Sequence, residues 1–353
     1  MSIRHLKISN LRNISTSEVD LSDKFNFITG RNGSGKSTVL EAIYMLARAR
    51  SYRSNRFSSI VQYGQNSINI FAESNHIHSY RIGINKTATS TLIKVNGALV
   101  KRVSEIAQIT PLQIITPMSH EILERGPEYR KRFIEWGVFH VEHSYFETYK
   151  RFYKILKQRN VLLKSNQFVN SWNQGFCDEA EKLNAIRTAY IASLTKYINI
   201  EANGLGINED LVVSWKAGWD RSKPLSSILE DQLKSDLTRG FTQSGPHRAD
   251  LKITINNKLA NQVLSRGQQK MLIVALHLAQ ASLFKERFGT APIIIIDDLV
   301  SELDDMNRLK VLRRLYELDA QVFITSIDGV ETGDLEIYHQ FNIADGTLTS
   351  VCN

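Results

Sequence analysis

The sequence predicts an α/β protein in which a nucleotide-binding core is built from both ends of the chain. Near the N-terminus, the glycine-rich stretch GRNGSGKS (30–37) follows an apolar run and precedes a helical one. Near the C-terminus, the apolar run PIIIIDD (292–298) ends in two aspartates. Between them, most of residues 117–240 have helical periodicity. We therefore expect a split core with an inserted helical domain.

The N-terminal part, residues 1–116, is expected to supply half of the core and a β subdomain. Residues 24–30 (KFNFITG) read as a buried strand, and residues 35–49 place apolar side chains three and four positions apart, as in a helix. Short β-prone runs follow between residues 67 and 101, with Asn96–Gly97 at a hairpin turn. They predict an antiparallel meander, which a purely parallel nucleotide fold would not contain.

The middle part, residues 117–240, is predicted to be the inserted helical domain. Its expected helices are at residues 119–138, 143–165, 177–199 and 224–239. No heptad pattern persists for three or four repeats, so a long coiled coil is not expected.

The C-terminal part, residues 241–353, returns to α/β order. A long amphipathic helix starts near Ser265, and two buried apolar strands (292–298 and 321–326) flank a helix over residues 305–318. Continuous apolar strands of this kind are typical of a parallel sheet covered on both faces.

Composition narrows the class of partner. The chain has 353 residues and a formal net charge of +8, which favours a polyanionic partner such as nucleic acid or an acidic membrane surface. Cys177 and Cys352 lack the CxxC spacing of a zinc site or a disulfide framework. No apolar run approaches the roughly 18 residues that span a bilayer. We expect a cytoplasmic protein without a membrane partner.

The stretch at residues 30–37 fits the phosphate-loop pattern G-x-x-x-x-G-K-[ST] in full. Glycines let backbone N–H groups turn toward an anion, Lys36 supplies charge for the β- and γ-phosphates, and Ser37 can hold Mg²⁺. A chance match in a glycine-rich turn is disfavoured, because an apolar strand precedes the loop and a helix follows it. The predicted ATP contacts are Gly30, Arg31, Asn32, Gly33, Ser34, Gly35, Lys36, Ser37 and Thr38.

The aspartates after the apolar strand at residues 293–296 predict the second half of the site. Asp297 would reach Mg²⁺, and Asp298 would orient or deprotonate the attacking water. The alternative is a pair of solvated carboxylates at a strand end.

The stretch LSRGQQK (264–270) has a second possible phosphate contact at a helix start. Ser265 fits an N-cap, Gln268 completes a capping box, and Gly267 lets a ligand approach the backbone. A well-capped structural helix is the alternative. Since the phosphate loop already contacts one side of the phosphates, a second helix end must reach the γ-phosphate from the opposite side, within the chain or from another molecule.

Taken together, these stretches resemble the RecF family of bacterial recombination and gap-repair ATPases, which is related to SMC heads. The resemblance spans nearly the whole chain. It rests on NLRNI (10–14), FNFITGRNGSGKSTVLEAIY (25–44), PLQIITP (111–117), GPEYRKRFIEWG (126–137), SGPHRADL (244–251), LSRGQQK (264–270) and IIIIDDLVSELD (293–304). It implies a P-loop ABC-type ATPase head that binds ATP between two subunits, with Lys36, Ser37 and Asp297 of one subunit facing Ser265 and Gly267 of the other.

The resemblance also implies roles for single residues. Gln113 would sense Mg²⁺ and the γ-phosphate, Arg12 would approach the nucleotide, and Asp304 in SELD (301–304) would cross the dimer interface. Asp298 stands where many relatives have Glu, so slow hydrolysis is expected. Ser326 stands where relatives often have His, which leaves the role of a γ-phosphate switch open.

For partners, the resemblance implies gapped DNA, with RecR, RecO and RecA in the same pathway, and support of replication restart and the SOS response. Independently, the stretch RARSYRSNR (48–56) predicts phosphate-backbone contacts through Arg48, Arg50, Arg53 and Arg56. Solvated surface arginines are the alternative. Two rival functions are a transporter ATPase subunit and a nucleotide-gated scaffold that does not hydrolyse ATP.

Overall fold

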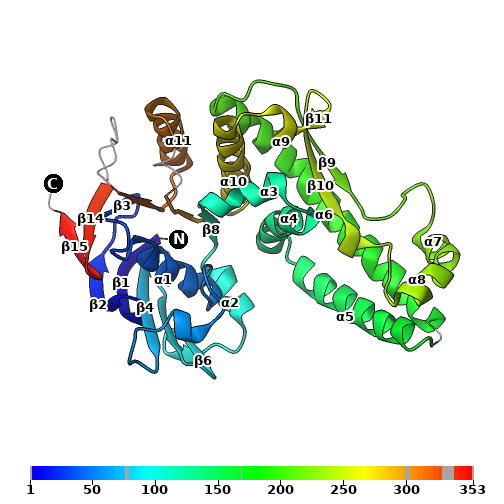
Figure 1. Cartoon of the computed structure of the whole chain (residues 1–353), viewed down its shortest axis with the longest axis horizontal. Helices are drawn as coiled ribbons and strands as arrows, with labels where there is room; N and C mark the ends of the chain where they lie inside the picture. The colour runs from blue at the N-terminus through cyan, green and yellow to red at the C-terminus, as the bar shows by residue number, and fades with distance from the viewer. Residues whose placement is uncertain (1, 76–78, 168, 299–302, 328–337, 352–353) are drawn as a thin grey trace. The chain divides into compact units, whose positions relative to one another are not determined.

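The structure is a computed structural model, and it describes residues 2–75, 79–167, 169–298, 303–327 and 338–351. The chain divides into two compact units (Figure 1). The first unit joins residues 1–119 with residues 284–353, and the second comprises residues 120–283. The first unit therefore combines both ends of the chain, as predicted.

The core of the first unit is a six-stranded sheet of order β15-β14-β3-β13-β12-β8. Its strands are β3 (Phe25–Thr29), β8 (Leu112–Ile115), β12 (Ile293–Ile296), β13 (Val322–Ser326), β14 (Tyr338–Ala344) and β15 (Thr347–Val351). All neighbours are parallel except β14 and β15. Every residue of β3, β12 and β13 is buried, as expected for strands covered on both faces, and β12 is wholly apolar.

A second six-stranded sheet in this unit is entirely antiparallel, in the order β2-β1-β4-β5-β6-β7. Its strands are β1 (Ser2–Leu11), β2 (Ile14–Asp20), β4 (Ile68–Asn75), β5 (Arg81–Lys86), β6 (Thr91–Val95) and β7 (Ala98–Leu99). The predicted meander is confirmed, and the first two strands extend it.

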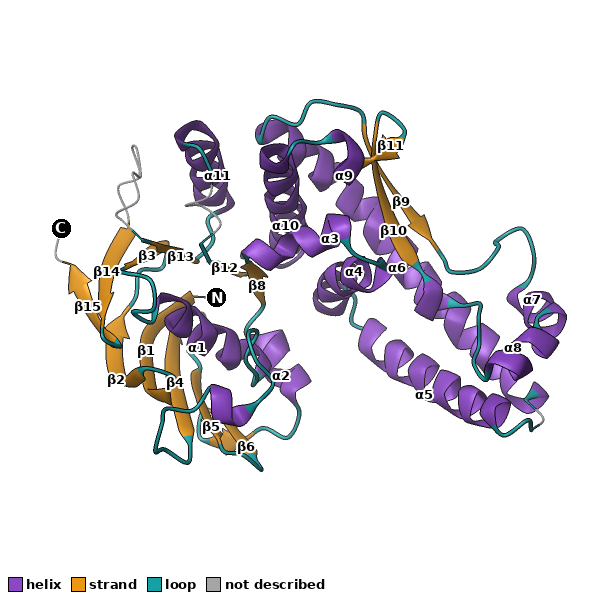
Figure 2. Ribbon diagram, in the orientation of Figure 1, coloured by secondary structure: helices purple, strands orange, loops and turns teal. Residues whose placement is uncertain are grey.

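Helix α1 (Lys36–Arg48) is buried along most of its length. Its apolar residues share one hydrophobic core with side chains from both sheets, such as Leu6, Ile70 and Ile295. Figure 2 shows the antiparallel strands beside this helix. The other helical segments of the unit are η1 (Phe57–Ser59), α2 (Val103–Ile109), η2 (Pro117–His120, ending at the boundary) and α11 (Asp305–Leu318).

The second unit is mainly helical. Its helices are α3 (Glu121–Glu124), α4 (Pro127–Val141), α5 (Tyr145–Lys164), α6 (Asn170–Gly204), α7 (Leu225–Asp231), α8 (Leu233–Arg239), η3 (Pro246–Arg248), α9 (Ala260–Val263) and most of α10 (Arg266–Phe288). Among the described residues, no helix combines the length and apolarity needed to cross a bilayer.

The second unit also contains a small antiparallel sheet, one strand of which lies in the part of the chain predicted to be helical. Its order is β11-β10-β9, with β9 (Leu211–Lys216), β10 (Asp250–Ile255) and β11 (Lys258–Leu259). Because β9 pairs with β10 along its whole length, residues 241–283 join this unit and not the first unit. The division thus differs from the predicted boundary at residue 240.

Two of the stretches that carry the RecF resemblance, GPEYRKRFIEWG (126–137) and SGPHRADL (244–251), bind each other inside the second unit. Arg130 of α4 forms a bidentate ion pair with Asp250, at 2.7 and 3.1 Å. Next to it, Lys131 Nζ donates to the backbone carbonyl of His247 at 2.6 Å. Farther along α4, Gly137 leaves room for Tyr190, whose hydroxyl would lie 1.7 Å from an added Cβ. Both stretches therefore stabilise the insertion.

Two histidines of this unit are held neutral by burial. Desolvation lowers the pKa of His277 and of His247 to about 4, from an ordinary value of 6.5. The His277 ring packs edge-on against Phe133, with ring centroids 5.5 Å apart. The unfolded chain therefore binds a proton at these positions before the folded chain does.

We predict that acid weakens the fold through these groups. The folded-state pKa of each histidine lies below its unfolded value. The contribution of each neutral histidine to the free energy of unfolding is therefore complete above pH 6.5 and is lost as the pH falls toward 4. Each contributes up to about 3 kcal/mol. Urea denaturation of the wild type should show lower stability at pH 5 than at pH 7, and His277→Phe should reduce that difference by about 2 kcal/mol. An unchanged difference in the variant would contradict the assignment.

Candidate nucleotide-binding site

The glycine loop connects β3 to α1, and its backbone requires glycine at two positions. Gly30 has φ +152° and Gly35 has φ +119°. A Cβ on Gly30 would lie 2.5 Å from the carbonyl oxygen of Ile343, and one on Gly35 would lie 2.9 Å from the side chains of Asn13 and Ile343. Gly33 also has positive φ, at +82°, but no atom lies within 4 Å of its added Cβ. The neighbouring strand and turn thus fix the loop on one side.

Asn13 is a supporting residue that the sequence argument did not single out. Its Nδ2 donates to the carbonyl of Ser34 at 2.7 Å, and its Oδ1 accepts from Thr38 Oγ1 at 3.3 Å. The backbone N–H of Gly346 also donates to Ser34, at 3.2 Å. Asn13 lies in NLRNI, so the stretch that supported the resemblance contained this signal. The loop is therefore held by the β1–β2 and β14–β15 turns.

Lys36 is buried at the start of α1, and its ammonium lies within the loop. Nζ donates to the carbonyls of Gly30 at 2.7 Å and of Arg31 at 3.2 Å. Arg31, Asn32 and Gly33 are exposed. A buried cation beside a helix N-terminus is a strong attractor for phosphate.

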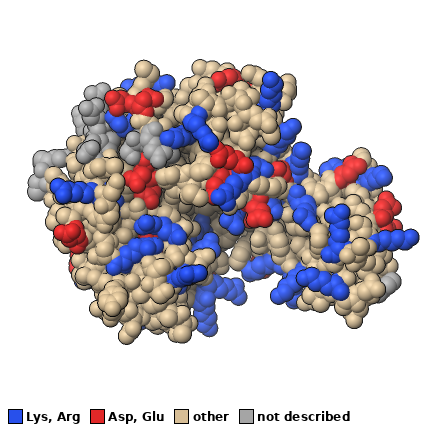
Figure 3. All heavy atoms as spheres, viewed as in Figure 1, with Lys and Arg blue, Asp and Glu red and all other residues tan. Residues whose placement is uncertain are grey.

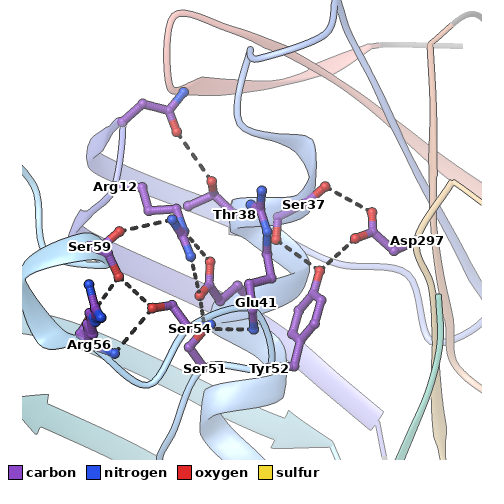
Figure 4. Close-up of polar contacts among 12 residues, drawn as sticks. Arg12, Ser37, Thr38, Glu41, Ser51, Tyr52, Ser54, Arg56, Ser59 and Asp297 are labelled. Carbon is purple, nitrogen blue, oxygen red and sulfur yellow. Dashed lines mark hydrogen bonds and ion pairs between the residues drawn. The ribbon is translucent and has the colours of Figure 1, made fainter. Parts of the chain in front are cut away.

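Asp297 follows β12, and three hydroxyl groups donate to its carboxylate. Ser37 Oγ and Thr325 Oγ1 donate to Oδ1 at 3.0 and 2.9 Å, and the Tyr52 hydroxyl donates to Oδ2 at 2.7 Å. Figure 4 shows Ser37 and Tyr52 both directed at this carboxylate. Ser37 and Asp297, each predicted to hold Mg²⁺, thus lie within hydrogen-bond distance of each other, whereas the contacts of Thr325 and Tyr52 were not predicted.

The residues around Ser37 fit a magnesium–nucleotide complex. A hydroxyl and a carboxylate, both oxygen donors, meet at the N-terminus of α1, and Mg²⁺ prefers such ligands when it also binds phosphate. Beside them lie Lys36 and a glycine-rich loop whose backbone N–H groups can turn toward an anion. Because Asp297 is 8% exposed, its charge needs such partners.

Asp298 turns the chain sharply after the strand. Its φ is +53°, and its backbone N–H donates to Thr325 Oγ1 at 2.9 Å. The residue is half-buried and directly follows the carboxylate that faces Ser37. This position is compatible with its predicted role toward an attacking water, which stays a prediction.

Gln113 is not brought to this edge of the sheet. It lies within β8 opposite Ile294, three residues before Asp297, and is 3% exposed. The N–H of Asp297 instead bonds the carbonyl of Ile115. Gln113 lies two residues before Ile115, the last residue of β8. At about 3.3 Å per residue, this is roughly 7 Å from the carboxyl end of the strand. We therefore do not retain its predicted contact with Mg²⁺.

Arg12 has a structural partner on α1. Its guanidinium binds Glu41 through two bonds, of 2.5 and 3.0 Å, and it also donates to the carbonyl of Ser59 at 2.9 Å. Glu41 is fully buried and accepts a further hydrogen bond from Ser51 (Figure 4). Arg12 thus neutralises a buried carboxylate, and its predicted approach to the nucleotide stays a prediction.

The capping box at the start of α10 is confirmed. The N–H of Ser265 donates to Gln268 Oε1 at 3.0 Å, and the N–H of Gln268 donates to Ser265 Oγ at 3.3 Å. Ser265, Gly267 and Gln268 are all exposed. This helix start belongs to the second unit, and its predicted contact with another subunit's ATP stays a prediction.

Asp304 is the N-cap of α11. Its side chain accepts a hydrogen bond from the N–H of Asn307 at 2.9 Å, and this bond lowers the pKa of the carboxyl. The residue is exposed. Ser301 and Glu302 of the predicted interface loop lie outside the described residues. Ser326 ends β13 and is buried.

The four predicted DNA-contacting arginines follow α1 or end it. Arg50, Arg53 and Arg56 are exposed, whereas Arg48 is half-buried, and burial lowers its pKa. On the face drawn in Figure 3, Lys and Arg side chains gather over the part of the first unit where Figure 1 shows α1. Three of the four side chains can therefore reach a polyanion.

We predict that the close approach at Gly30 is essential for the site. Gly30→Ala forces its Cβ against the Ile343 carbonyl, so we expect nucleotide affinity to fall at least tenfold and the melting temperature to drop. Gly64→Ala is the matched control, because Gly64 also has positive φ, at +79°, but no neighbour within 4 Å. Calorimetric titration with ATP measures both variants. Wild-type affinity in Gly30→Ala would refute the geometry.

Comparison with known proteins places the sequence in a family. The sequence matches the family described as RecF/RecN/SMC N terminal domain over residues 2–339. The DNA replication and repair protein RecF of Shewanella loihica is 36% identical over 362 residues, which cover 99% of this chain and 100% of that protein.

Solved structures show the same fold. A structure of the recombination mediator protein RecF-ATP in the RecFOR pathway superimposes with a TM-score of 0.87 at 25% identity, covering 99% of this chain and 98% of that one. An SMC head bound to the C-winged helix domain of ScpA gives a TM-score of 0.63 at 15% identity, over 99% of this chain and 98% of that one. The predicted ATPase-head fold is confirmed, and the chain belongs to the RecF family.

Proposed function

We propose that this protein is an ATP-dependent DNA-binding protein of recombinational gap repair. The observation that carries the proposal is the contact of Ser37 with Asp297 beside the phosphate loop. Related proteins are named for DNA replication and repair, and a structural relative is described with ATP in the RecFOR pathway. ATP and Mg²⁺ are the proposed ligands of the site.

The residues of the proposed site have separate roles in binding phosphate, binding Mg²⁺ and activating water. Backbone N–H groups of residues 30–38 and the Lys36 ammonium bind the phosphates. Ser37 and Asp297 hold Mg²⁺, which when bound neutralises phosphate charge during hydrolysis. Asp298 accepts a proton from the attacking water or orients it. The side chain of Asp298 is one methylene shorter than that of Glu, so we propose that hydrolysis is weak. We also propose that DNA stimulates it.

Pairing of two copies completes the site in this proposal. Ser265 and Gly267 are exposed at the N-terminus of α10, where N–H groups can bind a γ-phosphate from a second subunit. Asp304, also exposed, would contact the same interface. ATP can favour the closed pair because only that state satisfies both faces of the γ-phosphate.

The DNA side of the proposal rests on charge. Arg50, Arg53 and Arg56 are exposed beside α1, with Arg48 half-buried next to them. Such side chains bind phosphates without reading sequence. We propose that they engage DNA at junctions of single and double strands, where RecR and RecO assist the loading of RecA in replication restart and the SOS response.

Sedimentation velocity tests the pairing. We expect monomers with ADP and dimers with a non-hydrolysable ATP analogue, with gapped DNA favouring the dimer. Ser265→Arg should remain monomeric while its monomer binds ATP within about threefold of wild type, a difference below 1 kcal/mol. Thr188→Arg adds the same charge at an exposed site on α6 and should still dimerise.

Two outcomes would contradict the proposal. Loss of ATP affinity in monomeric Ser265→Arg would mean that this helix start serves its own chain. Equal phosphate release from wild type, Lys36→Ala and Asp298→Ala in single turnover would remove the enzymatic role and favour a scaffold.

A further inference from the structure

The segment of residues 49–56, between α1 and η1, combines hydrogen-bonded inner side chains with exposed arginines. Ser51 is buried and Tyr52 half-buried, and both make hydrogen bonds into the first unit. Arg50, Arg53 and Arg56 are exposed. We call residues 49–56 the arginine segment.

Tyr52 connects this segment to the magnesium carboxylate. Its hydroxyl donates to Asp297 Oδ2 at 2.7 Å and lies 3.4 Å from the carbonyl oxygen of Ser37 (Figure 4). Its ring packs edge-on against Tyr44 of α1, with centroids 5.4 Å apart.

The two oxygens of Asp297 have different donors. Oδ1 accepts from Ser37 and Thr325, whereas Oδ2 accepts from Tyr52. The hydroxyl of Tyr52 is the hydrogen-bond donor that the described structure shows for Oδ2. Its loss would remove this restraint on Oδ2, while the Ser37 and Thr325 bonds to Oδ1 would remain. Residues that orient a metal ligand in this way typically change metal affinity 10–100-fold when removed.

The arginine segment is also anchored next to Tyr52. Ser51 Oγ donates to the buried Glu41 and accepts from the N–H groups of Arg53 and Ser54, each at 2.9 Å. A short, internally bonded turn therefore holds Tyr52 and the neighbouring arginines as one piece. A shift of Arg53 on binding a polyanion would be transmitted to the Tyr52 hydroxyl.

We propose that Tyr52 is a positioning residue for Asp297 and that it links DNA on the arginine segment to the affinity of the site for Mg²⁺ and ATP. The second half of this statement rests on the proposed function. Linkage is reciprocal, so DNA and Mg²⁺-bound ATP must change each other's affinity by the same factor. In this proposal, the hydrogen bond from Tyr52 to Asp297 couples the DNA-binding segment to the metal–nucleotide site.

Tyr52→Phe tests the proposal, because it removes the hydroxyl and keeps the ring. ATP affinity is measured by calorimetry with EDTA and with Mg²⁺, each with and without gapped DNA at low salt. We expect unchanged affinity in EDTA, at least tenfold weaker affinity in Mg²⁺, and an effect of DNA on ATP affinity that shrinks toward one. Tyr44→Phe makes the same chemical change in the neighbouring ring and should behave as wild type. Equal melting temperatures confirm that both variants fold.

The measurements with and without Mg²⁺ and DNA test the positioning role and the link to DNA separately. Wild-type Mg²⁺ dependence in Tyr52→Phe would overturn the positioning role. Weaker Mg²⁺-dependent affinity with an undiminished effect of DNA would overturn the link. If the wild-type protein bound no gapped DNA at all, the proposed function and the link would fail together, whereas the Mg²⁺ arm would still decide the positioning role.

Discussion

The hydrogen bond between Ser37 and Asp297 is the contact on which the candidate nucleotide site depends. It joins residues 260 positions apart, across the junction of the two chain ends. It forms because β13 lies between β3 and β12 and pairs in parallel with both. The carboxyl ends of β3 and β12 therefore lie at the same edge of the sheet. The phosphate loop leaves β3 there, and the carboxylate leaves β12. A one-residue slip of either strand would turn its side chains to the opposite face and separate the two groups.

The helical insertion is stabilised by contacts of its own. Its family-specific stretches are tied together by the Arg130–Asp250 ion pair and by Lys131, within one unit and without any residue of the phosphate loop. Arg159 and Asp236, both fully buried, add a second ion pair at 3.0 Å. Breaking one partner of such a pair costs about 3–5 kcal/mol, because the other charge is left buried. The unit therefore folds around paired charges as well as apolar side chains, and it presents Ser265 at an exposed helix start.

Local patterns predicted most of the fold and the central part of the site. GRNGSGKS and IIIIDD carry their chemistry within a few residues, so the phosphate loop and Asp297 were found from sequence. Register between distant strands is not local, and Gln113, assigned by resemblance, proved to lie opposite Ile294 in the sheet interior. Contacts such as those of Tyr52 and Thr325 with Asp297 have no signature in either segment. The strand β9 was missed because helices surround it in the sequence, and its pairing partner β10 lies beyond the predicted boundary.

The central claim is that Ser37 and Asp297, supplied by opposite ends of the chain, form a single metal–nucleotide site. Electron paramagnetic resonance of Mn²⁺, titrated into protein with ATP, tests it most directly. In Asp297→Asn, the account predicts Mn²⁺ binding at least tenfold weaker than in wild type, with unchanged ATP affinity in EDTA. Undiminished Mn²⁺ binding by the folded variant would contradict it.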